Sequence, residues 1–278
     1  MNARIEMGMS FGAYCDLKAV NASAYLHFAD KTPEEAHYEI THPKEDTLSL
    51  VKGHATHAAI LEPKVFDSLY CAEPDFGDLR TKAARASRDT WRVERENHAT
   101  LPPKEYAKCI AMRDKVMADP YWKEFVVGKG QNEITVLWTD EETGLDCKAR
   151  IDRLTVAHGY PTLLDIKTDC GVGDRGIERA IFKYHYHIRM AWYAHALSRV
   201  KPAEWRIVLL WILNEPPHTL RTTEFDEAWL KEGQNGFRAC LNKYAECLKT
   251  GYYPGYPHGI DVVPMPIWAY RFSNPKGL

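Results

Sequence analysis

Two residues of opposite charge, Asp165 and Lys167, lie two positions apart in the segment TLLDIKT, residues 162–168. The segment alternates in the way a β-strand does, so both charged side chains point to one face while Leu164 and Ile166 point to the core. An aspartate beside a lysine in an otherwise apolar strand costs solvation free energy unless something binds there. The pattern therefore indicates a binding or catalytic site on this strand.

Two further carboxylates precede this strand. Asp152 lies thirteen residues before Asp165, across a predicted turn at 158–161, and Glu133 lies one strand earlier. Converging carboxylates repel one another, and a divalent cation relieves that repulsion. Oxygen ligands with open positions for water suit Mg²⁺ or Mn²⁺. A nearby lysine can position the attacking water and neutralise charge in a phosphoryl-transfer transition state. The alternative is that these charges form the solvated face of the sheet.

The segments that must position these residues predict an α/β protein. Three short β-rich segments joined by turn sequences predict an antiparallel meander, and a continuous apolar run predicts a buried fourth strand. The strands are expected at 132–138, 147–155, 162–168 and 205–213. Helices are expected at 21–27, from Pro33 onward, and at 53–63, 103–118, 176–200 and 226–250. This order predicts a mixed sheet.

Composition narrows the class of protein. The chain has 278 residues, of which 45% are hydrophobic and 27% charged, as in soluble globular proteins. We expect one domain, with a helical region at 1–130, a catalytic core at 131–250 and an irregular tail at 251–278. No apolar run is long enough to span a membrane. A net charge of −2 disfavours a protein that coats nucleic acid but leaves a focused cleft open. Seven scattered cysteines without CxxC, and no apolar N-terminal segment, predict a cytoplasmic protein.

Four motifs, in order, resemble those of a known family. Asp152, twelve residues and then Asp165-Ile166-Lys167 resemble the PD-(D/E)XK nuclease signature. GHATHAAILEP (53–63) resembles the histidine motif that precedes the core in RecE-type exonucleases, the exonuclease VIII family of phage recombination enzymes. RTKAARA (80–86) resembles the basic segment that follows it, and YHYHIRMAWYAHAL (184–197) the helix after the lysine. The resemblance runs from about Tyr14 to Leu213.

The resemblance implies a restriction-endonuclease-like α/β fold, a mixed sheet flanked by helices. By the same resemblance Asp152 and Asp165 are metal ligands, and Lys167 is the catalytic lysine. The wider metal set implied by it adds Glu133, His57 and Ile166.

The helix after the lysine departs from the family pattern. It carries Arg189 where the family usually has glutamine, four residues before Tyr193. Residues four apart share a helix face, so the pair can point into the site. Arginine there can bind a DNA phosphate in a bidentate way, or mark another substrate or a weakened enzyme.

The function implied by the resemblance is a Mg²⁺- or Mn²⁺-dependent DNA exonuclease acting 5′→3′ on linear duplex DNA. A ring-shaped homo-oligomer and a RecT-type single-strand annealing protein as partner are implied with it. The alternative is a non-catalytic module on the same fold that binds DNA ends or protein, which Arg189 favours.

Two other motifs are assigned no chemistry. GVGDRG (171–176) matches a dinucleotide-binding loop in form, but the strand before it carries Asp165 and Lys167 where a buried parallel strand is apolar. We interpret these glycines as a loop beside the site. We interpret His54, His185 and His187 as surface or hydrogen-bonded histidines, because their spacing lacks the glutamate of a zinc-protease motif.

Overall fold

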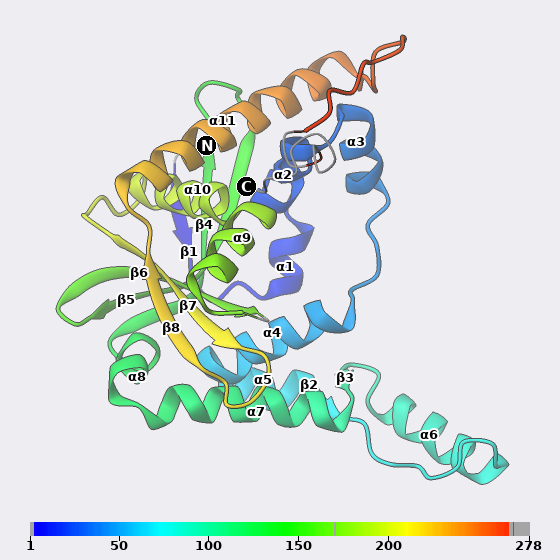
Figure 1. Ribbon diagram of the computed structural model, residues 1–278. Helices are drawn as coiled ribbons and strands as arrows, with labels where there is room; N and C mark the ends of the chain where they lie inside the picture. The colour runs from blue at the N-terminus through cyan, green and yellow to red at the C-terminus, as the bar shows by residue number, and fades with distance from the viewer. Residues whose placement is uncertain (1–2, 170, 267–268, 270–278) are drawn as a thin grey trace.

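A six-stranded mixed sheet forms the centre of the computed structural model, which describes residues 3–169, 171–266 and 269 (Figure 1). Its strand order is β1-β4-β5-β6-β7-β8. The strands are β1 (Arg4–Glu6), β4 (Gly130–Thr139), β5 (Asp146–Ala157), β6 (Tyr160–Asp169), β7 (Arg206–Leu213) and β8 (Leu220–Glu224). β6 and β7 are parallel, and the other neighbours are antiparallel.

The predicted meander is confirmed by β4, β5 and β6, and the predicted apolar strand by β7. Pairing between β5 and β6 extends from Ala157–Tyr160 to Arg153–Leu164 and then stops. β6 itself continues, because its pairing with β7 runs on to Asp169–Leu213. The two strands therefore separate just before Asp165, and backbone groups of β6 become free to bind side chains.

Helices connect and cover the strands. The N-terminal ones are α1 (Phe11–Asp16), α2 (Ala22–Asp30), α3 (Pro33–Thr41), α4 (Leu48–Leu61), α5 (Pro63–Leu69), α6 (Lys82–Glu94), α7 (Pro103–Ala118) and α8 (Pro120–Val127). The later ones are α9 (Asp174–Lys183), α10 (Tyr186–Ser198) and α11 (Glu227–Thr250). Several begin at the predicted signals: Asn21 accepts a bond from Ala24 N, Pro33 occupies the first turn of α3, and Asp226 caps α11.

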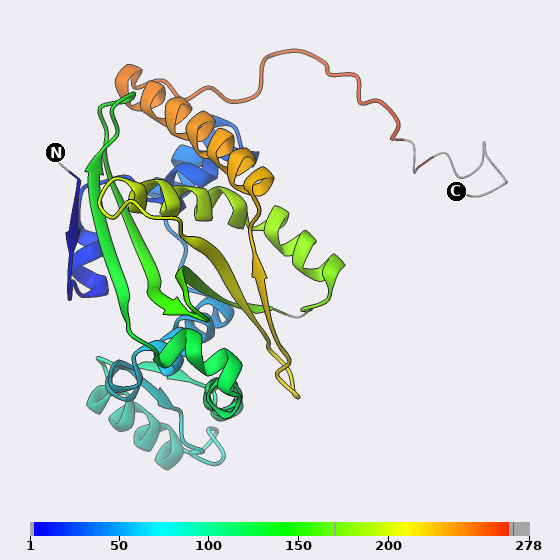
Figure 2. The same ribbon diagram turned by 90° about the vertical axis from the view of Figure 1, so that its left-hand side faces the viewer.

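Both faces of the sheet are buried, and β7 shows this by its alternation. Ile207, Leu209 and Trp211 pack in one core cluster with α2, α9, α10 and α11. Val208, Leu210 and Ile212 pack in another with α4, α7 and α8. A strand covered on both faces has no polar face, which explains the continuous apolar sequence (Figure 2). β7, which pairs with the strand that carries Asp165 and Lys167, therefore lies between two helical layers.

Several features differ from the sequence prediction, and α1, α5, α6 and α8 lie outside the expected helix ranges. The helix expected from Gly53 begins at Leu48, because the Thr47 side chain caps it there and LSLVK (48–52) contains no helix-breaking residue. The N-terminal region 1–130, expected to be helical, also contains β1 and a small parallel sheet of β2 (Tyr70–Ala72) and β3 (Ala99–Leu101). β8 was not predicted, since the sequence LRTTE has no clear strand alternation.

The tail has neither helix nor strand over residues 251–266, as predicted, and residues 267–268 and 270–278 lie outside the described residues. No helix in the described portion of the chain is long and apolar enough to span a membrane.

Candidate active site

The point where β5 and β6 separate holds Asp152 and the backbone of Ile166. One oxygen of the Asp152 carboxylate, Oδ2, accepts a hydrogen bond of 3.1 Å from the Ile166 N–H. This bond replaces the strand partner that the N–H loses when the β5–β6 ladder stops at Leu164. The Asp152 side chain is thereby held on the strand that carries Asp165 and Lys167.

His57 lies on α4, far from β5 and β6 in the sequence, and contacts the same group. Its Nδ1 lies 3.1 Å from Asp152 Oδ2, and its Nε2 lies 2.7 Å from the Ile166 carbonyl oxygen. Both ring nitrogens face acceptors, an arrangement that favours the doubly protonated ring. Burial acts to lower the pKa of His57, but the charge and hydrogen bond of Asp152 outweigh it and raise the pKa. His57 and Asp152 thus form an ion pair.

Asp165 and Lys167 form a second ion pair, on β6 itself. Asp165 is only 2% exposed. The Lys167 ammonium also lies 3.4 Å from the Ile166 carbonyl and 4.9 Å from the centroid of the Tyr186 ring, on α10. The Tyr186 ring therefore covers the lysine and excludes water from one side of it.

The two aspartates share one site and differ in ionisation. Burial, followed by the charge of Asp152, raises the pKa of Asp165. Burial acts in the same direction on Asp152, but His57 and Lys167 outweigh it and lower its pKa to about 2. A bound cation would relieve the repulsion between two carboxylates held in one site.

Glu133 lies beside this group in a strained backbone conformation. Its φ of 50° is in the left-handed region, in the middle of β4, between the register pairs Asn132–Arg153 and Ile134–Ile151. Its Oε2 accepts a 2.6 Å bond from Arg150 Nε. Burial, then the charge of Asp152, raises the pKa of Glu133 to about 7. Such strain persists only where surrounding structure enforces it, and it concentrates at functional sites.

Arg189 and Tyr193 lie on the face of α10 that borders the site. Burial acts to lower the pKa of Arg189, but Tyr193 and Asp165 outweigh it and raise it. Burial raises the pKa of the Tyr193 hydroxyl. No ion pair joins Arg189 to a carboxylate among the described residues, and its Nε is buried without a hydrogen-bond partner. Arg189 is therefore near Asp165 but does not pair with it.

The structure thus brings together Asp152, Asp165, Lys167, His57 and the Ile166 carbonyl, with Glu133 alongside. Sequence reasoning missed Arg150 and Tyr186. Arg150 stands two residues before Asp152 on one strand, and Tyr186 stands three and seven before Arg189 and Tyr193 on one helix. Both spacings place the residues on a shared face and could have identified them.

The oxygen atoms available at this site are ligands of the type that a hard divalent cation binds. The buried Asp165 carboxylate, the partly buried Asp152 carboxylate and the Ile166 backbone carbonyl are oxygen ligands of the type that Mg²⁺ and Mn²⁺ bind. Within the portion of the chain that the structure describes, no three His, Cys, Asp or Glu side chains already form a metal-binding group. Lys167 and Arg150 instead engage Asp165 and Glu133. The roles of all these residues as ligands stay predictions.

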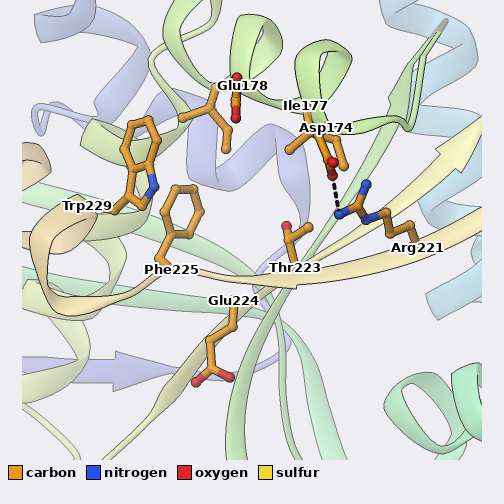
Figure 3. Close-up of a pocket in the computed structure, with 9 residues that line it drawn as sticks. Asp174, Ile177, Glu178, Arg221, Thr223, Glu224, Phe225 and Trp229 are labelled. Atoms are coloured by element: carbon orange, nitrogen blue, oxygen red, sulfur yellow. Dashed lines mark ion pairs between the residues drawn. The ribbon is translucent and has the colours of Figure 1, made fainter.

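Among the described residues, the features to which we assigned no chemistry take no part in the hydrogen bonds and ion pairs that hold Asp152 and Asp165. Gly171 and Gly173 precede α9 in a loop. His54 is exposed, His185 binds Asp30, and His187 is buried against Trp229. A cavity of about 220 Å³ between α9 and β8 is lined by the Phe225 and Trp229 rings and by the Arg221–Asp174 ion pair of 2.7 Å (Figure 3). None of the candidate site residues lines it.

The family model of a PDDEXK-like domain of unknown function (DUF3799) matches residues 11–265. The chain belongs to this family. The family places it in the PD-(D/E)XK superfamily, and the six-stranded mixed sheet flanked by helices is the α/β, restriction-endonuclease-like fold expected of it.

A solved structure agrees with this fold. A crystal structure of a "Putative exonuclease" from Eubacterium rectale aligns with a TM-score of 0.62 at 14% identity, covering 94% of this chain and 97% of the other. At that identity the likeness establishes the fold alone. A structure of SSO0001 aligns with a TM-score of 0.31 at 15% identity, covering 74% of this chain and 89% of the other. No curated protein matches the chain.

Proposed function

We propose that this protein is a divalent-metal-dependent deoxyribonuclease, and more specifically a RecE-type exonuclease that degrades linear duplex DNA 5′→3′. The observation that carries the proposal is the convergence of Asp152, Asp165, Lys167 and the Ile166 carbonyl where β5 and β6 separate. The family match supports it, as does the name of the E. rectale protein, "Putative exonuclease".

In this proposal Asp152, Asp165 and the Ile166 carbonyl hold Mg²⁺ or Mn²⁺, with His57 and Glu133 beside them. The bound cation would polarise the phosphodiester and lower the pKa of a water molecule. His57 keeps Asp152 ionised and fixes its direction, since its ring bonds both Asp152 and Ile166. Lys167 holds a positive charge where negative charge develops on the phosphorus oxygens. Tyr186 limits the water around that lysine.

The decisive experiment compares linear and covalently closed circular duplex DNA, with Mg²⁺ and with EDTA. We expect the linear form alone to be degraded, and only with the metal. End-labelled substrates then give the polarity, and release of label from the 5′ end first supports 5′→3′ action. Cleavage of the circular form would instead indicate an endonuclease.

We further propose that the chain forms one domain, works in the cytoplasm and assembles as a ring that supplies single strands to a RecT-type annealing protein. A closed ring would retain DNA by topology, which suits a net charge of −2. A monomeric mass by light scattering at micromolar concentration would contradict the ring.

Two observations favour the second candidate, a non-catalytic module that binds DNA ends or protein. Lys167 already pairs directly with Asp165, and Arg189 replaces the usual glutamine. The module would bind linear DNA with and without Mg²⁺ and leave both DNA forms intact, so the same experiment separates the two candidates.

A further inference from the structure

A second cavity, of about 330 Å³, lies between α2 and the junction of α9 with α10. Its charged and titratable lining residues are His27, Asp30, Lys31, Lys183, Tyr184, His185 and Arg189. Three permanent cations thus face one carboxylate. Positive charge therefore predominates in the cavity, which suits an anion.

Two of these cations have no carboxylate partner among the described residues. Lys31 pairs with Glu39, and Asp30 pairs with His185 at 2.6 Å. Lys183 makes no ion pair, and its ammonium lies 5.0 Å from the centroid of the Tyr184 ring. The Arg189 guanidinium likewise has no ion pair, and its Nε is buried without a hydrogen-bond partner. A buried donor without an acceptor costs free energy that a bound anion would recover.

The same cavity lies at the N-terminus of α10. His185, the residue before the helix, has a left-handed φ of 53° and makes no side-chain capping bond. The first backbone N–H groups of this 13-residue helix therefore have no side-chain acceptor, and a helix N-terminus carries partial positive charge. Phosphate groups bind at such termini.

Arg189 connects this cavity to the catalytic group. It lines the cavity, and it lies one helix turn beyond Tyr186, whose ring covers Lys167. We propose that the cavity binds a phosphate group of the DNA strand next to the one being cleaved, held by Lys183, Arg189 and the N-terminus of α10. This inference rests on the proposed function in that the phosphate belongs to DNA. It adds a subsite that fixes the strand relative to the carboxylates.

The test uses Lys183→Gln, with Lys201→Gln as its matched control. Lys201 is also exposed, makes no ion pair among the described residues and lies 5.4 Å from an aromatic centroid, that of Trp205, but it does not line the cavity. Binding of a short duplex is measured by fluorescence anisotropy in EDTA over a series of salt concentrations. Lys183→Gln should weaken binding about tenfold and lower the salt slope by about one, since one phosphate contact is lost. Lys201→Gln should stay within about twofold.

Duplexes with a 5′-phosphate and with a 5′-hydroxyl distinguish two sources of the phosphate. If Lys183→Gln loses affinity only for the 5′-phosphorylated duplex, the cavity binds the terminal phosphate. If it loses affinity equally for both duplexes, the cavity binds a phosphate of the backbone. Equal effects of the two lysine variants, or no effect of either, would overturn the proposal. The proposal would also be overturned if the cavity bound inorganic phosphate but the two lysine variants had the same affinity for DNA. Binding is measured in EDTA, so the test decides the proposal even if the protein has no nuclease activity.

Discussion

Asp165 and Lys167 are each other's closest charges in a buried site, so removal of either one has two effects. Without Lys167, the proposed reaction loses the cation that faces developing charge, and Asp165 is left buried without a partner. We expect Lys167→Ala and Asp165→Ala each to lower the rate of DNA hydrolysis by about 10³-fold or more. Rates are measured on linear duplex, with circular dichroism to confirm folding.

A double variant separates the catalytic effect from the electrostatic one. Asp165→Asn with Lys167→Met removes both charges together, so it should be more stable than Lys167→Ala alone by about 1–3 kcal/mol, yet equally inactive. Urea unfolding gives the comparison. Retained hydrolysis in any of these variants would refute the catalytic assignment.

Arg189 tests whether the departure from the family pattern matters. Arg189→Ala removes a partly buried guanidinium near Asp165 and should weaken DNA binding or turnover about tenfold. Arg189→Gln keeps a donor of similar reach and is the usual family residue, so we expect the rate in Mg²⁺ to be retained. Its affinity in EDTA should still fall, as for Lys183→Gln, because the charge that faces the cavity is lost. Equal losses of rate in the two Arg189 variants would show that the reaction requires the charge itself.

At this scale, strand alternation was enough to predict that Asp165 and Lys167 share a face. The position of His57 is different, because about a hundred residues separate it from β6 and local spacing carries no information about that contact. Only the family resemblance singled it out from His54. The left-handed backbone of Glu133 was also beyond prediction, since glutamate has no preference for that conformation.

At the scale of elements, α10 and α11 approach so closely that one position admits only glycine. A Cβ added to Gly233 on α11 would lie 2.2 Å from the His187 carbonyl oxygen and 2.9 Å from Ala191 Cβ. Gly233→Ala should therefore destabilise the protein by about 2 kcal/mol or more, as overpacking does. Because α10 carries Tyr186 and Arg189, DNA binding should weaken as well.

Gly53, in α4, is the matched control for this substitution. A Cβ there meets no atom within 4 Å, so Gly53→Ala should stabilise the helix by about 0.5–1 kcal/mol. Thermal unfolding of both variants measures the expected loss of stability in Gly233→Ala and the expected gain in Gly53→Ala. A neutral Gly233→Ala would contradict the close approach of the helices.

The elements with strong sequence signals were predicted, and those that depend on partners were not. β7 is a continuous apolar run, and α11 has a capping aspartate and a following glycine, so each could be read locally. β1 and β8 are short strands at the two edges of the sheet. Their strand conformation depends on pairing with β4 and β7, which no short segment encodes.

For the whole molecule, Asp140 makes stability depend on acid pH. Its carboxylate joins the β4–β5 turn to α11 through two bonds of 2.9 Å from Arg238 and two from Thr143. Burial acts to raise the pKa of Asp140, but these bonds outweigh it and lower it to about 2. The folded-state pKa is below the unfolded value, so this stabilisation is complete above about pH 4 and lost as pH falls through about 2.

The contribution of this carboxylate above pH 4 is about 2 kcal/mol. Asp140→Asn should lose about that amount at pH 6, and the difference from the native protein should shrink between pH 4 and pH 2.5. Urea unfolding at several pH values measures it. A difference that stays constant with pH would show that the Asp140 charge is not the cause.

The use of the Ile166 backbone has a consequence for genetics. Its N–H and carbonyl contact Asp152, His57 and Lys167, whereas its side chain is fully buried in an apolar cluster. Every amino acid except proline supplies the same N–H and carbonyl. Natural selection at position 166 therefore acts on the volume of the side chain and not on its chemical groups. Ile166→Val should therefore retain the reaction, and an alanine scan would record a packing residue. An ester in place of the amide between residues 166 and 167, which weakens the carbonyl as an acceptor, is the substitution that exposes its chemical role.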